Sequence, residues 1–263
     1  MNKKIKQIIK KKNKSKIVSL TAYSKNIAKI LDKYCDIVLV GDSMANVLYG
    51  HKNTHAIDLT NIIQHTKSVK LGIKKSLLVV DMPKGTYNNT EKAKRNAKLV
   101  MKFTKCDAIK LESNNKNFNI IKSLVASNIP VMGHIGYTPQ FKKRFYVDGN
   151  TPKSSQKLLK EALLVEKAGA FSIVLECITP SASKMITQKL KIPTIGIGSS
   201  SYCDGQILVT DDILGMSGFY PRFVKKYVNL SKIIEKAVKN YCKDVKLRKF
   251  PSQKNFLNGT KYK

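Results

Sequence analysis

The sequence predicts an α/β fold, a (β/α) TIM-type barrel with an N-terminal leading helix and C-terminal closing helices. Short apolar runs rich in Val and Ile end abruptly in ionisable residues, which is typical of strands buried on both faces of a parallel sheet. These runs alternate with segments of helical periodicity, and the 263 residues suit one barrel of about 250 residues. We therefore expect a single domain over residues 1–263, with an open doubly wound sheet or two small domains as the alternatives.

Eight segments are expected to be strands, because each is a short apolar run bounded by Gly, Pro or polar residues. In chain order they are residues 17–21, 36–40, 77–81, 108–112, 129–134, 171–176, 192–197 and 206–209. The interval between Ile197 and Gln206 is too short for an ordinary crossover helix, so one unit of the barrel is expected to be irregular.

The segments between these strands place apolar residues on one helical face. Asp58 or Thr60 can cap one helix, which Gly72 closes, and the Thr90-Glu91 start of another resembles an N-cap. The expected helices cover residues 5–10, 24–34, 58–72, 90–103, 118–126, 154–168 and 181–190. From residue 211 onward the pattern predicts helices that close the base of the barrel or pack on a neighbouring chain.

Composition argues against several classes of protein. The formal net charge is +32, but nearly all of it is Lys spread along the chain, whereas nucleic-acid recognition favours clustered Arg and a recognisable motif. No apolar stretch approaches the roughly 20 residues that cross a bilayer. The five cysteines are scattered and never form a C-x-x-C pair, which favours reduced thiols. We expect a cytoplasmic protein without nucleic-acid or membrane partners, and Cys177 as a buried filler thiol in preference to a nucleophile.

Three acids stand at the carboxyl ends of separate predicted strands: Asp42, Asp81 and Glu112. Because the carboxyl ends of parallel strands meet at one rim, these side chains are expected to lie together. Carboxylates on an open rim suit a magnesium ion, and the residues lack the His or Cys cluster of a zinc site. The alternative for each single Asp is a cap on the following helix.

Three further residues on the same rim could carry chemistry. Lys110 points to the same side of its strand as Glu112, where it could stabilise an enolate or merely pair with that acid. His134 could bind a substrate carboxylate, although a lone strand-end His is as often structural. Glu176, on a different strand, could act as the general base that removes a proton from carbon next to a carbonyl. The Gly196-Ile197-Gly198 segment could let a ligand approach the backbone.

Several motifs, in order along the chain, resemble the ketopantoate hydroxymethyltransferase family. They are LVGDS at 39–43, HTKSV at 65–69, VMGHIG at 131–136, TPQ at 138–140, VLEC at 174–177, IPTIGIG at 192–198 and DGQILV at 204–209. The likeness extends from about residue 20 to the C-terminal helices, with comparable spacing throughout.

The resemblance implies a one-carbon transferase of pantothenate and coenzyme A biosynthesis, which is a homodecamer in this family. It implies transfer of the hydroxymethyl group of methylenetetrahydrofolate to 3-methyl-2-oxobutanoate, giving 2-dehydropantoate. It further implies that Mg²⁺ is held by Asp42 and Asp81 with Glu112 close by, and that these two aspartates bind the substrate together with Ser43, Lys110 and His134. Glu176 is then the proton acceptor.

The chain departs from the family pattern in a few places. Ser113-Asn114 replaces two expected glycines and Ser199-Ser200 replaces an expected Ala-Gly pair. Lys84 replaces an expected aromatic residue, and the loop at 141–150 lacks the expected Gly-Gly-Tyr-Lys pattern. Two other classes stay open on the sequence: a metal-dependent enolate-forming barrel of the phosphoenolpyruvate mutase or isocitrate lyase kind, and a basic nucleic-acid-binding protein.

Overall fold

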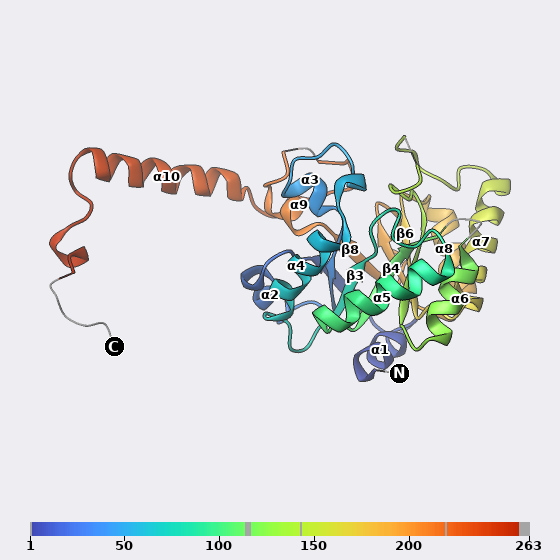
Figure 1. The fold of residues 1–263 in the computed structure, drawn as a ribbon. Helices are drawn as coiled ribbons and strands as arrows, with labels where there is room; N and C mark the ends of the chain where they lie inside the picture. The colour runs from blue at the N-terminus through green and yellow to red at the C-terminus, as the bar shows by residue number, and fades with distance from the viewer. Residues whose placement is uncertain (1, 114–116, 143, 219, 258–263) are drawn as a thin grey trace.

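Eight parallel strands form a closed barrel, which confirms the predicted fold and excludes the open sheet (Figure 1). The computed structural model describes residues 2–113, 117–142, 144–218 and 220–257. The strands, each hydrogen-bonded to the next and the last to the first, are β1 (Ile17–Thr21), β2 (Ile37–Val40), β3 (Leu77–Asp81), β4 (Ala108–Glu112), β5 (Val131–Gly136), β6 (Ser172–Glu176), β7 (Thr194–Ile197) and β8 (Gly205–Leu208).

Helices surround this barrel. Those described are α1 (Lys3–Lys10), α2 (Lys25–Leu31), α3 (Met44–Val47), α4 (Leu59–Lys70), α5 (Thr90–Thr104), α6 (Phe118–Ala126), α7 (Pro152–Lys167), α8 (Pro180–Lys189), α9 (Thr210–Leu214) and α10 (Leu230–Lys246), with 3-10 turns η1 (Thr54–Ala56) and η2 (Gln253–Asn255). The α3 and η1 turns fall within the loop predicted after β2. No helix separates β7 from β8, as the short spacing predicts.

Helix starts show where local sequence is decisive and where it is not. Asp58 caps α4 through a capping box with Asn61, in agreement with the prediction. The prediction for α5 is displaced by one residue: the N-cap is Asn89, whose side chain accepts a hydrogen bond from the backbone N–H of Lys92. Both Asn and Thr can cap a helix, so the conformation of the preceding loop determines which of the two residues does so.

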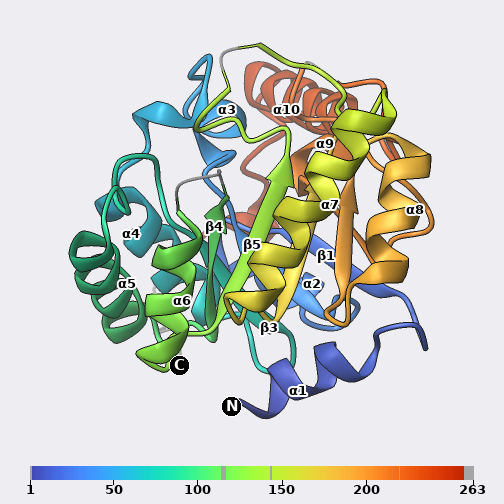
Figure 2. The same ribbon diagram turned by 90° about the vertical axis from the view of Figure 1, so that its right-hand side faces the viewer.

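The core has an inner and an outer layer. Side chains from alternate strand positions fill the barrel itself, and Ile5 and Ile8 of α1 belong to this inner cluster. The outer faces of the strands pack against α4 to α8. Figure 2 shows α1 at one end of the barrel and α3, α9 and α10 at the other. α1 closes the amino-terminal end of the strands, whereas a cavity lies at the opposite end.

Asp204 fastens the leading segment to the barrel. Its carboxylate accepts hydrogen bonds from Lys12 Nζ at 2.8 Å, from the backbone N–H of Asn13 at 3.1 Å and from the backbone N–H of Thr194 at 2.9 Å. Burial opposes ionisation of this carboxyl, but the hydrogen bonds from Lys12, Thr194 and Asn13 outweigh it and lower the pKa of Asp204.

Asp204→Ala is expected to lower the free energy of unfolding by about 3–5 kcal/mol, because Lys12 is left buried without its partner. Urea denaturation measures this loss. Because the pKa of Asp204 is lowered on folding, its contribution is present above the unfolded value of about 3.9 and is lost as pH falls through the folded value. Glu235→Ala, which breaks the exposed pair with Lys239, is the control that should leave stability unchanged. An equal loss in both variants would contradict this role for Asp204.

The C-terminal region contains a helix that leaves the barrel. Whereas α9 lies beside the open end, α10 projects away from the barrel of its own chain, and none of its residues is buried (Figure 1). The sequence allows this helix either to close the base of its own barrel or to pack on a neighbouring chain. The helix does not pack on the base of its own barrel. Within the described residues no helix is both long and apolar enough to cross a membrane.

Candidate active site

The carboxyl ends of the strands surround a cavity of about 510 Å³. Six of the seven predicted site residues line it, and the seventh, Asp81, forms hydrogen bonds with two of them. The six are Asp42, Ser43, Lys110, Glu112, His134 and Glu176. The strand register explains the convergence, since Asp81 is paired with Lys110 between β3 and β4, and Glu112 with His134 between β4 and β5.

Asp81 binds two neighbours inside the rim. Its Oδ1 accepts a hydrogen bond from Lys110 Nζ at 2.8 Å, and its Oδ2 accepts one from the backbone N–H of Asp42 at 3.1 Å. The side chains of Asp81 and Lys110 are 4% and 7% exposed, so this is a buried ion pair. The predicted pairing of Lys110 with Glu112 is replaced by pairing with Asp81, which neighbours it on the adjoining strand.

Negative charge exceeds positive charge in this cluster. Burial, and then the charge of Asp81, raises the pKa of Asp42 to about 7. Burial followed by the charge of Asp42 also raises the pKa of Glu112 well above its ordinary value. Burial alone would lower the pKa of Lys110, but the three surrounding carboxylates outweigh it and raise that pKa. Lys110 alone does not balance the charge of these carboxylates. A bound cation would therefore stabilise their ionised forms.

This donor set fits a magnesium ion better than a transition metal. Among the described residues, no group of three or more His, Cys, Asp or Glu side chains is arranged to enclose a metal by itself. Magnesium commonly uses one or two carboxylates and completes its shell with water and substrate oxygens. Asp42 and Glu112 line the cavity, whereas Asp81 accepts hydrogen bonds from Lys110 and Asp42, and the predicted metal-binding role of these acids stays a prediction.

Gln140 links two of these acids, and sequence reasoning assigned it no role. Its Nε2 donates to Asp42 Oδ2 at 2.8 Å, its backbone N–H donates to Glu112 Oε2 at 2.9 Å, and its Oε1 accepts from the Tyr87 hydroxyl at 2.5 Å. Gln140 is 1% exposed. A single loop residue therefore holds the Asp42 and Glu112 carboxylates in place, and only its position in the TPQ motif could have drawn attention to it.

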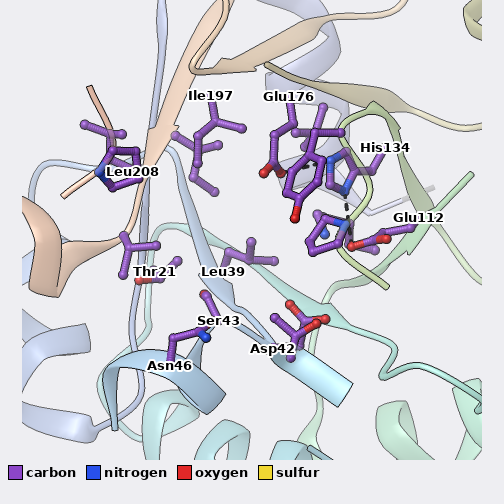
Figure 3. Close-up of a pocket in the computed structure, with 18 of the residues that line it drawn as sticks. Thr21, Leu39, Asp42, Ser43, Asn46, Glu112, His134, Glu176, Ile197 and Leu208 are labelled. Carbon is purple, nitrogen blue, oxygen red and sulfur yellow. Dashed lines mark ion pairs between the residues drawn. The ribbon is translucent and has the colours of Figure 1, made fainter. Parts of the chain in front are cut away.

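His134 lies between two acids on the far side of the cavity. Its Nε2 is 3.1 Å from Glu176 Oε2, and its Nδ1 is 3.9 Å from Glu112 Oε1 (Figure 3). Burial, and then the charge of Lys110, lowers the pKa of His134. Neither ring nitrogen has a well-aligned hydrogen bond within the described residues. A buried, neutral imidazole of this kind is suited to contacting a polar substrate group.

Glu176 extends from the end of β6 toward the centre of the cavity (Figure 3). Its side chain is 18% exposed, the most accessible among the ion-paired acids of the cavity, and thus open to a bound ligand. Next to it, Cys177 is buried, and burial followed by the charge of Glu176 raises the pKa of that thiol to about 12. A thiol that stays protonated is a poor nucleophile, in agreement with the expected filler role.

Ser43 lies on another side of the cavity, at the start of α3. Its hydroxyl is 2.8 Å from the hydroxyl of Tyr23. Burial raises the pKa of Tyr23, which keeps this phenol neutral and able to act as a donor. The His65 ring in turn contacts the Tyr23 carbonyl at 2.8 Å. This arrangement orients the Ser43 hydroxyl, whose predicted contact with a substrate stays a prediction.

Two of the departures from the family pattern, Ser113 and Lys84, contact residues that line the cavity. The backbone N–H of Ser113 donates to the His134 carbonyl at 2.7 Å, whereas Asn114 lies outside the described residues. Lys84 Nζ lies 3.2 Å from His55 Nδ1, and His55 lines the cavity mouth. The glycine segment predicted to admit a ligand is approached by another side chain, because the Phe223 ring packs against Gly198.

Comparison with known proteins identifies the relatives of this chain. Residues 2–253 match the family model described as ketopantoate hydroxymethyltransferase. A 3-methyl-2-oxobutanoate hydroxymethyltransferase from Pelagibacter ubique is 53% identical over 255 residues, covering 97% of this chain and 99% of that protein. One from Anaplasma marginale is 45% identical, covering 93% of this chain and 90% of that protein.

Solved structures show the same fold at low sequence identity. A 2,3-dimethylmalate lyase, described as a PEP mutase/isocitrate lyase superfamily member, has a TM-score of 0.62 and 13% identity, covering 98% of this chain and 93% of that one. A phosphonopyruvate hydrolase in complex with oxalate and Mg²⁺ has a TM-score of 0.62 and 11% identity, covering 95% and 92%. At such identities the likeness concerns the barrel alone.

Proposed function

The chain belongs to the ketopantoate hydroxymethyltransferase family, and we propose that it transfers the hydroxymethyl group of methylenetetrahydrofolate to 3-methyl-2-oxobutanoate, giving 2-dehydropantoate. One observation carries the proposal: acids, a lysine and a neutral histidine from separate strands face one cavity in an arrangement suited to enolate chemistry. These residues at the strand ends together offer a binding site for an anionic keto acid and a base beside it.

Asp42 and Asp81 would hold Mg²⁺, with Glu112 close by. A bound Mg²⁺ would supply Lewis-acid stabilisation for the negative charge that develops on the keto oxygen. Lys110, already fixed against Asp81, contributes a positive charge at the same place without the cost of reorientation during the reaction. Ser43 and His134 supply polar contacts that orient the carboxylate and keto group of the substrate.

Glu176 is the proposed general base. Its Oε2 takes the proton from the branched carbon of the keto acid, and the resulting carbanionic carbon forms a C–C bond to the one-carbon unit of the folate. Water supplies the hydroxyl oxygen, and both C–N bonds of that unit break, so that tetrahydrofolate leaves. The adjacent His134 Nε2 lies 3.1 Å from Glu176 Oε2. Because His134 is held neutral by burial, it leaves Glu176 free to accept the proton.

Product formation with and without folate tests the proposal. Purified protein supplied with Mg²⁺, 3-methyl-2-oxobutanoate and methylenetetrahydrofolate should form 2-dehydropantoate, detected by mass spectrometry, and should form none when folate is omitted. An enolate-forming barrel enzyme of the phosphoenolpyruvate mutase or isocitrate lyase kind would convert its acid substrate without folate. A nucleic-acid-binding protein would bind oligonucleotides with a steep salt dependence and show no turnover.

We also infer that the enzyme is a homo-oligomer in the cytoplasm. The family resemblance implies that this oligomer is a decamer. The apolar residues of α10, among them Ile234, Val238 and Tyr241, gather on one face and are exposed. The outer side of β1 and β8 offers an apolar groove lined by Val18 and Tyr227. Both surfaces favour contact with further copies of the chain. The five cysteines are free thiols, as the cytoplasm requires.

Val238→Glu is expected to shift the protein toward smaller assemblies, because it places a charge in the apolar face of α10. Light scattering coupled to size exclusion measures the mass. Lys236→Glu, on the polar face of the same helix, is the matched control and should retain the wild-type mass. An unchanged mass for Val238→Glu, with the wild type oligomeric, would show that this face is not the interface.

A further inference from the structure

The cavity has two halves of different character. Asp42, Glu112, His134 and Glu176 lie in one half, whereas the wall opposite, here called the apolar half, includes Ile197 and Leu208 (Figure 3). A five-carbon keto acid bound beside Lys110 would leave much of the 510 Å³ empty. The apolar half is therefore the place for the second substrate of the proposed reaction.

One carboxylate belongs to this apolar half. Asp212 lies on α9, directly after β8, and lines the cavity. It is half-buried and forms no ion pair within the described residues, and its burial raises its pKa. A ligand that presents N–H donors would therefore stabilise the ionised form of this carboxylate.

An aromatic side chain stands in the same wall. Phe223 lines the cavity, and its ring packs directly on Gly198, where an added Cβ would lie 2.6 Å from Phe223 Cδ1. Gly198 also has φ +56°, a conformation that favours glycine. The Phe223 ring therefore packs against the end of β7, and Phe223 also lines the cavity.

We propose that Asp212 and Phe223 bind the reduced pterin ring of the folate co-substrate: the carboxylate accepts hydrogen bonds from the ring N3–H and 2-amino group, and the phenyl ring stacks on the pterin. The inference rests on the proposed function. A planar carboxylate matches two adjacent donors in a bidentate manner, and aromatic rings stack readily on flat heterocycles. A pterin in the apolar half would direct its one-carbon unit toward the charged half, where Glu176 generates the carbanion.

Asp212→Asn tests this site, with Asp211→Asn as the matched control. Asp211 is the preceding residue of the same short helix and is also half-buried, but it does not line the cavity. We expect Asp212→Asn to raise the KM for methylenetetrahydrofolate by about tenfold or more, because two charge-assisted hydrogen bonds are lost. Folate-independent deuterium exchange at the branched carbon of the keto acid should stay at the wild-type rate in both variants, and Asp211→Asn should keep the wild-type KM.

A folate analogue lacking the 2-amino group separates recognition from a structural effect. Wild-type enzyme should bind this analogue more weakly than the natural cofactor, whereas Asp212→Asn should bind the two equally. Phe223→Ala should likewise raise the KM for folate by about fivefold or more while sparing exchange. Equal discrimination by wild type and Asp212→Asn, or an unchanged KM, would overturn the inference. If wild-type protein forms no 2-dehydropantoate at all, it is the proposed function that fails.

Discussion

Glu176→Gln is expected to lower the rate of 2-dehydropantoate formation by about 10²- to 10⁴-fold, the usual contribution of a positioned general base. Glutamine has the size of glutamate and can still contact His134 Nε2, so the cavity should keep its shape. Because the side chain is partly exposed, the change leaves no buried charge unpaired. Binding of the keto acid and Mg²⁺ should therefore remain close to that of the wild type.

Deuterium exchange measures this step without the second substrate. The proton on the branched carbon of 3-methyl-2-oxobutanoate is followed by NMR in D₂O with Mg²⁺ and no folate. Glu161→Gln, a half-buried acid on α7 that does not line the cavity, is the control and should exchange like the wild type. Exchange at the wild-type rate in Glu176→Gln would remove this residue from the role of base.

The barrel and most of its rim could be predicted because both depend on local patterns. Apolar runs that end in Asp81, Glu112 and Glu176 identify strands together with their carboxyl ends. Once the strands are parallel and consecutive, their registers bring those ends to one rim without any further information. The site was therefore predicted as a consequence of topology.

What the sequence could not give depends on contacts between distant segments. Gln140 reaches Asp42 across 98 positions of the chain, and nothing in the local sequence indicates that contact. Asp212 and Phe223 lie after the last strand, where no strand end indicates their direction. The preference of Lys110 for Asp81 over Glu112 follows from the register between β3 and β4, which the two strands specify only when they are paired.

Asp81→Ala is expected to weaken Mg²⁺-dependent keto-acid binding by about 100-fold or more, since even residues that only support metal ligands contribute about 10- to 100-fold. The change removes one proposed metal ligand and the acceptor of the Asp42 backbone N–H. It also leaves Lys110 buried without its ion-pair partner, which should lower the free energy of unfolding by about 3–5 kcal/mol.

The loss of keto-acid binding and the loss of stability can be separated, because a second substitution should restore only the stability. The double variant Asp81→Ala, Lys110→Met removes the unpaired charge and should recover much of the lost stability in urea denaturation, but not the binding. Asp81→Asn keeps the size of the side chain and an acceptor for Lys110, so it should stay folded while calorimetry shows weakened keto-acid binding in Mg²⁺. If Asp81→Asn binds the keto acid in Mg²⁺ as tightly as the wild type, Asp81 holds Lys110 and does not bind the metal.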